Sequence, residues 1–218
     1  MARYYNLLIA VIGGCMLLFC MACSEESICP DENHPHLIDL GLPNGTKWAC
    51  CNVGSPSPEM SGGYYAWGET DIKSSYDKEN YRHGELSNQL PQRMGNIAGS
   101  EYDVARKQCG SSWEMPSSYK WQELIDYCKW DWVKYKGHHG WKVTGPNGNK
   151  LFIPACGMKG GSELISEEEH GHYWASDWDA QERRPMSFDT NGGYYGVRPT
   201  ISYVTYGFNV RPIESYGD

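Results

Sequence analysis

Three Asn-Gly pairs are the feature that most constrains the fold of this chain. They are Asn44-Gly45, Asn147-Gly148 and Asn191-Gly192, and each lies between short extended, apolar segments. In a two-residue hairpin turn both central positions need a positive φ, which asparagine and glycine tolerate better than other residues. The sequence therefore predicts three β-hairpins spread along the chain.

Two helices are expected between the first and the second hairpin. Tyr102, Ala105 and Cys109 recur at helical spacing within residues 100–109, and a glycine follows as a stop signal. A second apolar stripe begins just after Ser117, a residue type that caps helix N-termini. Its members are Trp121, Leu124, Ile125 and Cys128.

Short strands are expected over most of the remaining chain. The segments are 141–143, 151–153, 173–175, 186–188, 194–197 and 208–210. We expect Trp174 and Phe208 to lie in the core, at alternate positions of central strands. Two early helices followed by many short antiparallel strands indicate an α+β domain.

The N-terminus has the pattern of a signal peptide. Arg3 is the only charged residue before Glu25, and an apolar run over residues 7–18 leads to Ala22 and Cys23. The run is shorter than the roughly 20 residues that a membrane-spanning helix needs. A retained anchor is the alternative to cleavage.

Cys23 is the expected site of lipidation, because lipoprotein signal peptidase cuts before a lipid-modified cysteine that follows a small residue such as Ala22. Cys15 is a rival, but cutting there leaves an apolar segment, residues 16–19, on the mature protein. We expect residues 1–22 to be removed and residues 23–36 to form the lipidated N-terminus and a linker. The acyl chains on Cys23 would then anchor the protein to the membrane, which is its expected partner at this end.

Residues 24–27, Ser-Glu-Glu-Ser, resemble the surface-export signal of Bacteroides-type lipoproteins. A solvated linker is the other interpretation. The expected location is the outer membrane, with the lipid-anchored domain exposed at the cell surface.

Composition limits the class of the domain. About 196 residues behind the signal peptide suit one domain with a sizeable core. The net charge of −8 and the lack of basic clusters argue against a nucleic-acid partner. The chain has 16 tyrosines and nine tryptophans but only four phenylalanines, which is typical either of proteins that present aromatic surfaces or of a β-rich core.

The six cysteines behind the anchor leave their pairing open. They are Cys29, Cys50, Cys51, Cys109, Cys128 and Cys156. Export permits disulfides, and sequence alone does not select among the connectivities. Neither a CxxC pair nor a Cys/His pattern with familiar zinc spacing is present. If Cys50 and Cys51 lie in a strand, at most one of them faces the core.

Several strings, in this order, resemble the Fibrobacter succinogenes major paralogous domain and cover about residues 37–213. They are DLGLPNGTKWA at 39–49, CNVG at 51–54, YYAWGET at 64–70, WEMP at 113–116, LFIPA at 151–155, YWAS at 173–176 and GFNVRP at 207–212. The resemblance implies a C-type-lectin-like fold, which formylglycine-generating enzymes and the variable receptors of diversity-generating retroelements share. Many members of the family are lipoproteins, and most have no assigned activity.

The chain departs from the family at three cysteines. Cys109 stands where the family often has tryptophan, Cys156 where a small residue is common, and Cys50 is an addition beside Cys51. These thiols either form a disulfide peculiar to this protein or remain small buried hydrophobes.

Catalysis and cofactors are not expected. Formylglycine-generating enzymes use a late pair of copper-binding cysteines, but no cysteine follows Cys156 here. The Glu-Pro-Asn, Gln-Pro-Asp and Trp-Asn-Asp strings of calcium-dependent lectins are absent as well. His170 and His172 beside acidic residues, and the pair His138-His139, have residue types that bind zinc or copper, but a solvated acidic turn is the favoured interpretation.

The best candidate for a binding face is the aromatic and polar segment 173–206. Rings provide rigid contact area, short polar groups provide hydrogen bonds, and arginine offers a planar fork for carboxylates. The expected ligand is an extracellular protein or glycan. The expected ligand-binding residues are Asp177, Trp178, Tyr194, Tyr195, Arg198 and Tyr203.

The sequence therefore predicts a non-catalytic, lipid-anchored surface protein with a lectin-like binding domain. One alternative is a structural or assembly subunit whose aromatic residues are packed inside. Another is a degenerate relative of formylglycine-generating enzymes.

Overall fold

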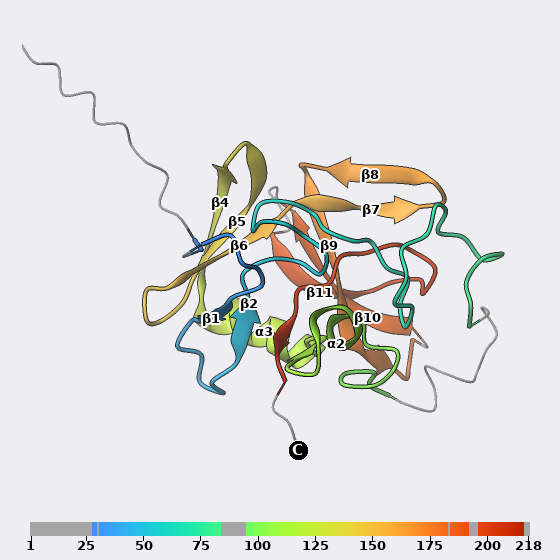
Figure 1. Ribbon diagram of the computed structural model, residues 1–218, viewed down its shortest axis with the longest axis horizontal. Helices are drawn as coiled ribbons and strands as arrows, with labels where there is room; N and C mark the ends of the chain where they lie inside the picture. Colours follow the sequence, from blue (N-terminus) through green and yellow to red (C-terminus); the bar gives the residue numbers. More distant parts are fainter. Residues whose placement is uncertain (1–27, 30, 84–94, 183, 192–195, 216–218) are drawn as a thin grey trace, which may run out of the picture.

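The computed structural model describes residues 28–29, 31–83, 95–182, 184–191 and 196–215, and its described part consists of three β-sheets and two helices (Figure 1). The first sheet joins the two ends of the domain. In sheet order its strands are β1 (Leu37–Asp39), β2 (Lys47–Ala49), β12 (Ile213–Glu214) and β3 (Trp113–Glu114).

The second sheet is the largest. Its strands in order are β11 (Val197–Ile201), β10 (Arg184–Asn191), β9 (His170–Asp179), β7 (Cys156–Gly160) and β8 (Glu163–Glu167). All neighbours are antiparallel except β7 and β9, which run parallel and meet at Gly157 and Gly171. A third, antiparallel sheet contains β4 (Lys129–Tyr135), β5 (His138–Thr144) and β6 (Lys150–Pro154).

Helices α2 (Val104–Cys109) and α3 (Ser118–Tyr127) lie between β2 and β4 in the chain. The predicted α+β class is confirmed: antiparallel sheets predominate, with two helices in the described residues. Among these residues no helix is both long and apolar enough to cross a membrane.

The three predicted hairpins are confirmed by the strand pairing. β1 pairs with β2, β5 with β6, and β10 with β11. Gly45 and Gly148 have positive φ angles, of 67° and 88°, but Asn44 and Asn147 do not, so the predicted two-residue turn type is wrong. The connections span residues 40–46 and 145–149, and each glycine N–H closes a four-residue turn by donating to the carbonyl of Leu42 or Gly145. The turn at Gly192 lies outside the described residues.

Helix α2 is shorter than predicted because Asp103 caps it. The buried Asp103 carboxylate accepts hydrogen bonds from four backbone N–H groups, those of Gly99, Ala105, Arg106 and Met115, at 2.8–3.2 Å. Burial raises the pKa of this carboxyl, and the four N–H groups oppose that shift by favouring the charged form. One carboxylate thus fixes the start of the helix and the end of β3.

Aromatic rings stack on one another within two core clusters. In the first, Trp121 of α3 stacks on Phe188 of β10 with ring centroids 4.3 Å apart. In the second, Trp174 stacks on Phe208 at 4.2 Å, and the Trp174 indole N–H donates to the Tyr65 carbonyl at 2.7 Å. The expectation that Trp174 and Phe208 are core residues is confirmed.

The strand predicted over residues 208–210 is wrong. These residues form no named strand; Phe208 bridges to Tyr65 instead, and Asn209 lies beside Tyr173. Cys50 and Cys51 lie outside a strand, because β2 ends at Ala49, so the alternation considered for them does not apply and both are buried. Strands β3, β4, β7, β8 and β12 had no sequence prediction.

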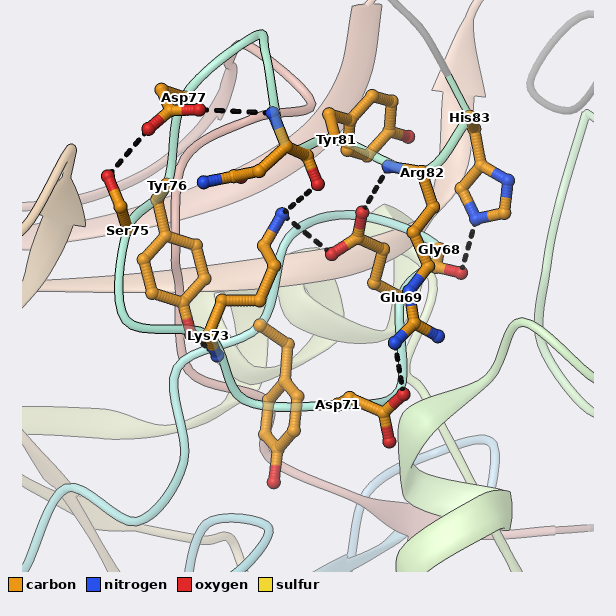
Figure 2. Close-up of polar contacts among 12 residues, drawn as sticks. Gly68, Glu69, Asp71, Lys73, Ser75, Tyr76, Asp77, Tyr81, Arg82 and His83 are labelled. Carbon is orange, nitrogen blue, oxygen red and sulfur yellow. Dashed lines mark hydrogen bonds and ion pairs between the residues drawn. The ribbon is translucent and has the colours of Figure 1, made fainter.

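The segment from Gly68 to His83 is folded around the buried side chain of Glu69 (Figure 2). The Glu69 carboxylate lies 2.8 Å from Lys73 Nζ and accepts the Arg82 backbone N–H at 2.7 Å. The Lys73 ammonium lies over the rings of Tyr76 and Tyr81, 5.5 and 5.8 Å from their centroids. These polar groups contact one another within the segment, so we assign the segment a structural role.

Candidate functional site

A row of polar side chains crosses the second sheet. Asp189 of β10 pairs with His172 of β9 on one side and with Arg198 of β11 on the other. Because side chains alternate along a strand, these three lie on the face opposite Tyr173 and Phe188, which are core residues. The hairpin register therefore places an acid, an imidazole and a guanidinium side by side.

The Asp189 carboxylate is at the centre of the row. Its Oδ1 lies 3.6 Å from His170 Nδ1 and 3.8 Å from His172 Nδ1, and its Oδ2 lies 3.7 Å from Arg198 Nη2. The two imidazole rings are nearly parallel, at 10°, with centroids 5.9 Å apart. The Asp189 side chain is 13% exposed, whereas that of Arg198 is 52% exposed. The row thus runs from a sheltered carboxylate to an accessible cation.

Burial lowers the pKa of His172. The carboxylate of Asp189 opposes this shift, and the His170 imidazole adds to it. His172 also packs against the Phe208 ring at 5.2 Å, at the edge of the second core cluster. At neutral pH its ring is therefore uncharged, with a nitrogen available to accept a hydrogen bond or to bind a metal ion.

Two imidazoles and one carboxylate make a set that can hold a divalent cation. One ligand atom from each of His170, His172 and Asp189 lies within 4.8 Å of the others. The set equally suits hydrogen bonding to hydroxyl groups, because it combines acceptors with the donors of the neighbouring Arg198. The arrangement contains no activated nucleophile, since no serine or cysteine is among its members.

A second exposed feature lies at the other end of β10. The Arg184 guanidinium carbon lies 4.3 Å from the centroid of the Tyr203 ring, and Arg184 Nη2 donates to the Tyr203 hydroxyl at 3.3 Å. Tyr206 contacts Tyr203 edge-on at 5.7 Å. Tyr203 remains 51% exposed, so this stack presents a ring and a cation on the surface.

The six predicted ligand-binding residues occupy different environments. Arg198 belongs to the polar row, and Tyr203 belongs to the exposed stack. Both carboxylate oxygens of Asp177 are engaged by Ser118, at the start of α3. Trp178 is half-buried and packs against Trp67 with centroids 5.7 Å apart. Tyr194 and Tyr195 lie outside the described residues.

Sequence reasoning singled out His170 and His172 but did not join them to Asp189 or Arg198. The available signal was the predicted hairpin at Asn191-Gly192, which pairs β10 with β11 and so sets Asp189 opposite Arg198. That hairpin carries no information on the register of β9, which sets His172 opposite Asp189.

The other histidine pair, His138 and His139, contacts Glu168 and joins two parts of the fold. Glu168, at the turn between β8 and β9, lies 2.8 Å from His138 Nδ1 and accepts the His139 backbone N–H at 2.6 Å. Burial acts to raise the pKa of Glu168, but the His139 N–H and the two imidazoles outweigh it, and the net shift is downward. The contact joins the second sheet to the start of β5.

The chain matches no family model, no curated protein and no solved structure. Its function is therefore inferred from its own residues and their geometry.

Proposed function

We propose that this protein is a lipid-anchored, surface-exposed binding protein whose domain has a C-type-lectin-like fold and takes an extracellular glycan on the face of β9, β10 and β11. The observation that carries the proposal is the row in which Asp189 lies between His172 and Arg198. Sugar hydroxyl groups both donate and accept hydrogen bonds, and this row offers acceptors and donors at spacings of a few ångströms.

The exposed stack of Arg184 and Tyr203 adds an aromatic surface at the far end of the same strand pair. Binding sites for small polar molecules combine apolar contact area with a few placed polar groups. The lectin-like assignment of the fold is supported by the seven sequence strings in their family order and by the α+β architecture. A protein ligand would use the same residues and is the alternative outcome of the binding test.

A glycan array probed with the full chain tests the binding site. Arg198→Ala and Asp189→Asn should each weaken binding to any glycan found by about tenfold or more, the equivalent of about 1.4 kcal/mol. Tyr203→Ala should also weaken it. Tyr119→Ala is the matched control, because Tyr119 is 82% exposed but lies on α3.

Equal binding by the wild-type chain and the Arg198 and Asp189 variants would reject this site. If no glycan binds, and a protein captured by the wild-type chain is lost by the same variants, the face is a protein-binding site. Self-association that these variants do not affect would favour the structural-subunit alternative.

The membrane anchor is supported by the sequence of residues 1–27 and has its own test. Mass spectrometry of the mature N-terminus should show diacylglyceryl-modified Cys23. Lipid on Cys15, or an unmodified chain that still begins at Met1, would contradict the proposal. This result is independent of the ligand.

A further inference from the structure

The structure brings together two cysteines and two histidines that are scattered over residues 29–50. Cys29, His34 and His36 precede or adjoin β1, while Cys50 follows β2. The β1–β2 pairing explains the approach, because the Cys50 backbone N–H donates to the His36 carbonyl at 2.9 Å and extends the hairpin by one residue pair. One ligand atom from each of the four side chains lies within 4.8 Å of all the others.

We propose that Cys29, His34, His36 and Cys50 form a structural zinc site. A tetrahedral zinc ion with Zn–S bonds of about 2.3 Å and Zn–N bonds of about 2.0 Å separates its ligand atoms by about 3.3–3.8 Å. His34 Nδ1 lies 3.7 Å from Cys29 Sγ and 3.2 Å from Cys50 Sγ. His36 Nδ1 lies 3.8 Å from Cys50 Sγ. These separations are those of a tetrahedral set.

The surroundings of His36 fit metal binding through Nδ1. Its other ring nitrogen, Nε2, lies 3.1 Å from the Asp31 carboxylate. A metal-bound histidine usually donates its second N–H to a carboxylate or carbonyl, which fixes the ring orientation and strengthens the ligand. Asp31 is itself held by the Asn33 backbone N–H at 2.7 Å.

The Cys50 sulfur also has the surroundings of a bound thiolate. It accepts the backbone N–H of His36 at 3.0 Å, and its residue is fully buried. Two thiolates and two neutral imidazoles balance the charge of Zn²⁺, so the occupied site is electrically neutral. On binding, each thiol releases its proton to solvent. Two sulfur and two nitrogen ligands in tetrahedral geometry select zinc over the harder divalent ions.

Zinc at this position would hold residues 29–36 against the open end of the β1–β2 hairpin, where β1 begins and β2 ends. The consequence for the tether rests on the proposed lipidation of Cys23. Only residues 24–28 would then separate the anchor from the first ligand, a span of about 20 Å at full extension. The site would hold the domain close to the membrane surface.

The main rival is a disulfide between Cys29 and Cys50, which an exported protein permits. Among the described cysteines no disulfide is formed. A disulfide would not explain why the Nδ1 atoms of His34 and His36 both face the Cys50 sulfur. The two alternatives differ in metal content and in mass.

The test uses the full chain, purified in detergent with bound metal retained, and measures zinc per chain by elemental mass spectrometry. Cys50→Ser and His34→Ala should each lose one zinc relative to the wild type. Cys109→Ser, a change of thiol in the second core cluster, should lose none. His172→Ala reports separately on any ion held by the polar row. Cobalt substitution should give a thiolate-to-cobalt absorption band that the Cys50 variant lacks.

Asp31→Asn keeps the proposal testable if a ligand variant does not fold. The Asp31 side chain is 55% exposed and contributes no ligand atom, so its replacement should leave the fold intact while weakening zinc affinity by about 10–100-fold in a chelator competition. Zinc content unchanged in the Cys50 and His34 variants would overturn the proposal. So would protein isolated without reductant that lacks zinc and contains a Cys29–Cys50 disulfide.

Discussion

The carboxylate of Asp177, near the end of β9, caps helix α3 through Ser118. Asp177 Oδ1 accepts the Ser118 backbone N–H at 2.6 Å, and Oδ2 accepts the Ser118 hydroxyl. Ser117 stands at the N-cap position but makes no side-chain capping bond. A carboxylate supplied by a strand 59 residues later therefore satisfies the helix end and adds a favourable charge there.

Replacing Asp177 should destabilise the domain. Asp177→Ala leaves the Ser118 N–H and hydroxyl without this acceptor, and loss of a helix cap costs about 0.5–2 kcal/mol. We expect the urea midpoint to fall by the corresponding amount with no change in the slope of the transition. Asp126→Ala is the control, since Asp126 is in the same helix and contacts Gln122 in solvent. Equal midpoints for the two variants would contradict the capping role.

The stability of the domain should depend on pH through the protonation of His172. Burial lowers the pKa of this imidazole in the folded state, whereas its pKa is near 6.5 when unfolded. The unfolded chain therefore binds a proton more readily, so the contribution is fully present above about pH 6.5 and is lost as the pH falls below it. Urea midpoints of the wild type should decrease between pH 7.5 and pH 5.5.

His172→Gln removes this titration and should flatten the midpoint-against-pH curve over the same interval. The lowered pKa of Glu168 acts in a different interval, because it affects stability only below its usual value of 4.5. A variant that keeps the wild-type slope between pH 7.5 and pH 5.5 would show that another group is responsible.

The features that sequence predicted are those encoded within short segments. The Asn-Gly turns fixed the three hairpins, and the stripe of Trp121 and Leu124 located α3 with its buried face. Each of these depends on neighbours along the chain, so the local pattern carried the information.

The parts that sequence did not predict depend on pairing between distant segments. Ser117 is the right residue type for a cap, but the capping acid comes from β9. Cys29 and Cys50 match no familiar zinc spacing, and only the β1–β2 register brings Cys50 opposite His36. The role of Asp189 likewise follows from the registers of β9, β10 and β11, which the turn at Gly192 alone does not set.

Gly140 should be intolerant of any side chain. It lies in β5 between Val133 and Pro154, and a Cβ built there would be 2.5 Å from the Ile153 carbonyl oxygen and 2.8 Å from the Pro154 Cα. Backbone atoms cannot move aside without disturbing β6, so Gly140→Ala should cost about 1–3 kcal/mol.

Gly160→Ala is the matched control for this prediction. Gly160 is also in a strand, β7, but the nearest contact of its Cβ would be the flexible end of Ile165, at 3.3 Å. We expect its urea midpoint to stay close to that of the wild type. A Gly140 variant as stable as the Gly160 variant would show that β5 and β6 can separate at low cost.

The buried pair of Glu69 and Lys73 should determine whether the segment from Gly68 to His83 stays folded (Figure 2). The two side chains are 1% and 13% exposed, and removing one charge of a buried pair costs about 3–5 kcal/mol because the other is left uncompensated. Glu69→Gln keeps the shape and an oxygen for the Arg82 N–H. Amide hydrogen exchange in this segment should therefore accelerate strongly.

The adjoining pair of Asp71 and Arg82 provides the comparison, because it has a shorter contact, 2.7 Å, but side chains that are 56% and 60% exposed. Exposed ion pairs contribute about 0–1 kcal/mol, so Asp71→Asn should leave amide exchange in the segment nearly unchanged. If both variants accelerate exchange equally, burial is not what stabilises the Glu69–Lys73 pair. If only the Glu69 variant does so, the segment is held by its one buried carboxylate and by the Lys73 ammonium packed over Tyr76 and Tyr81.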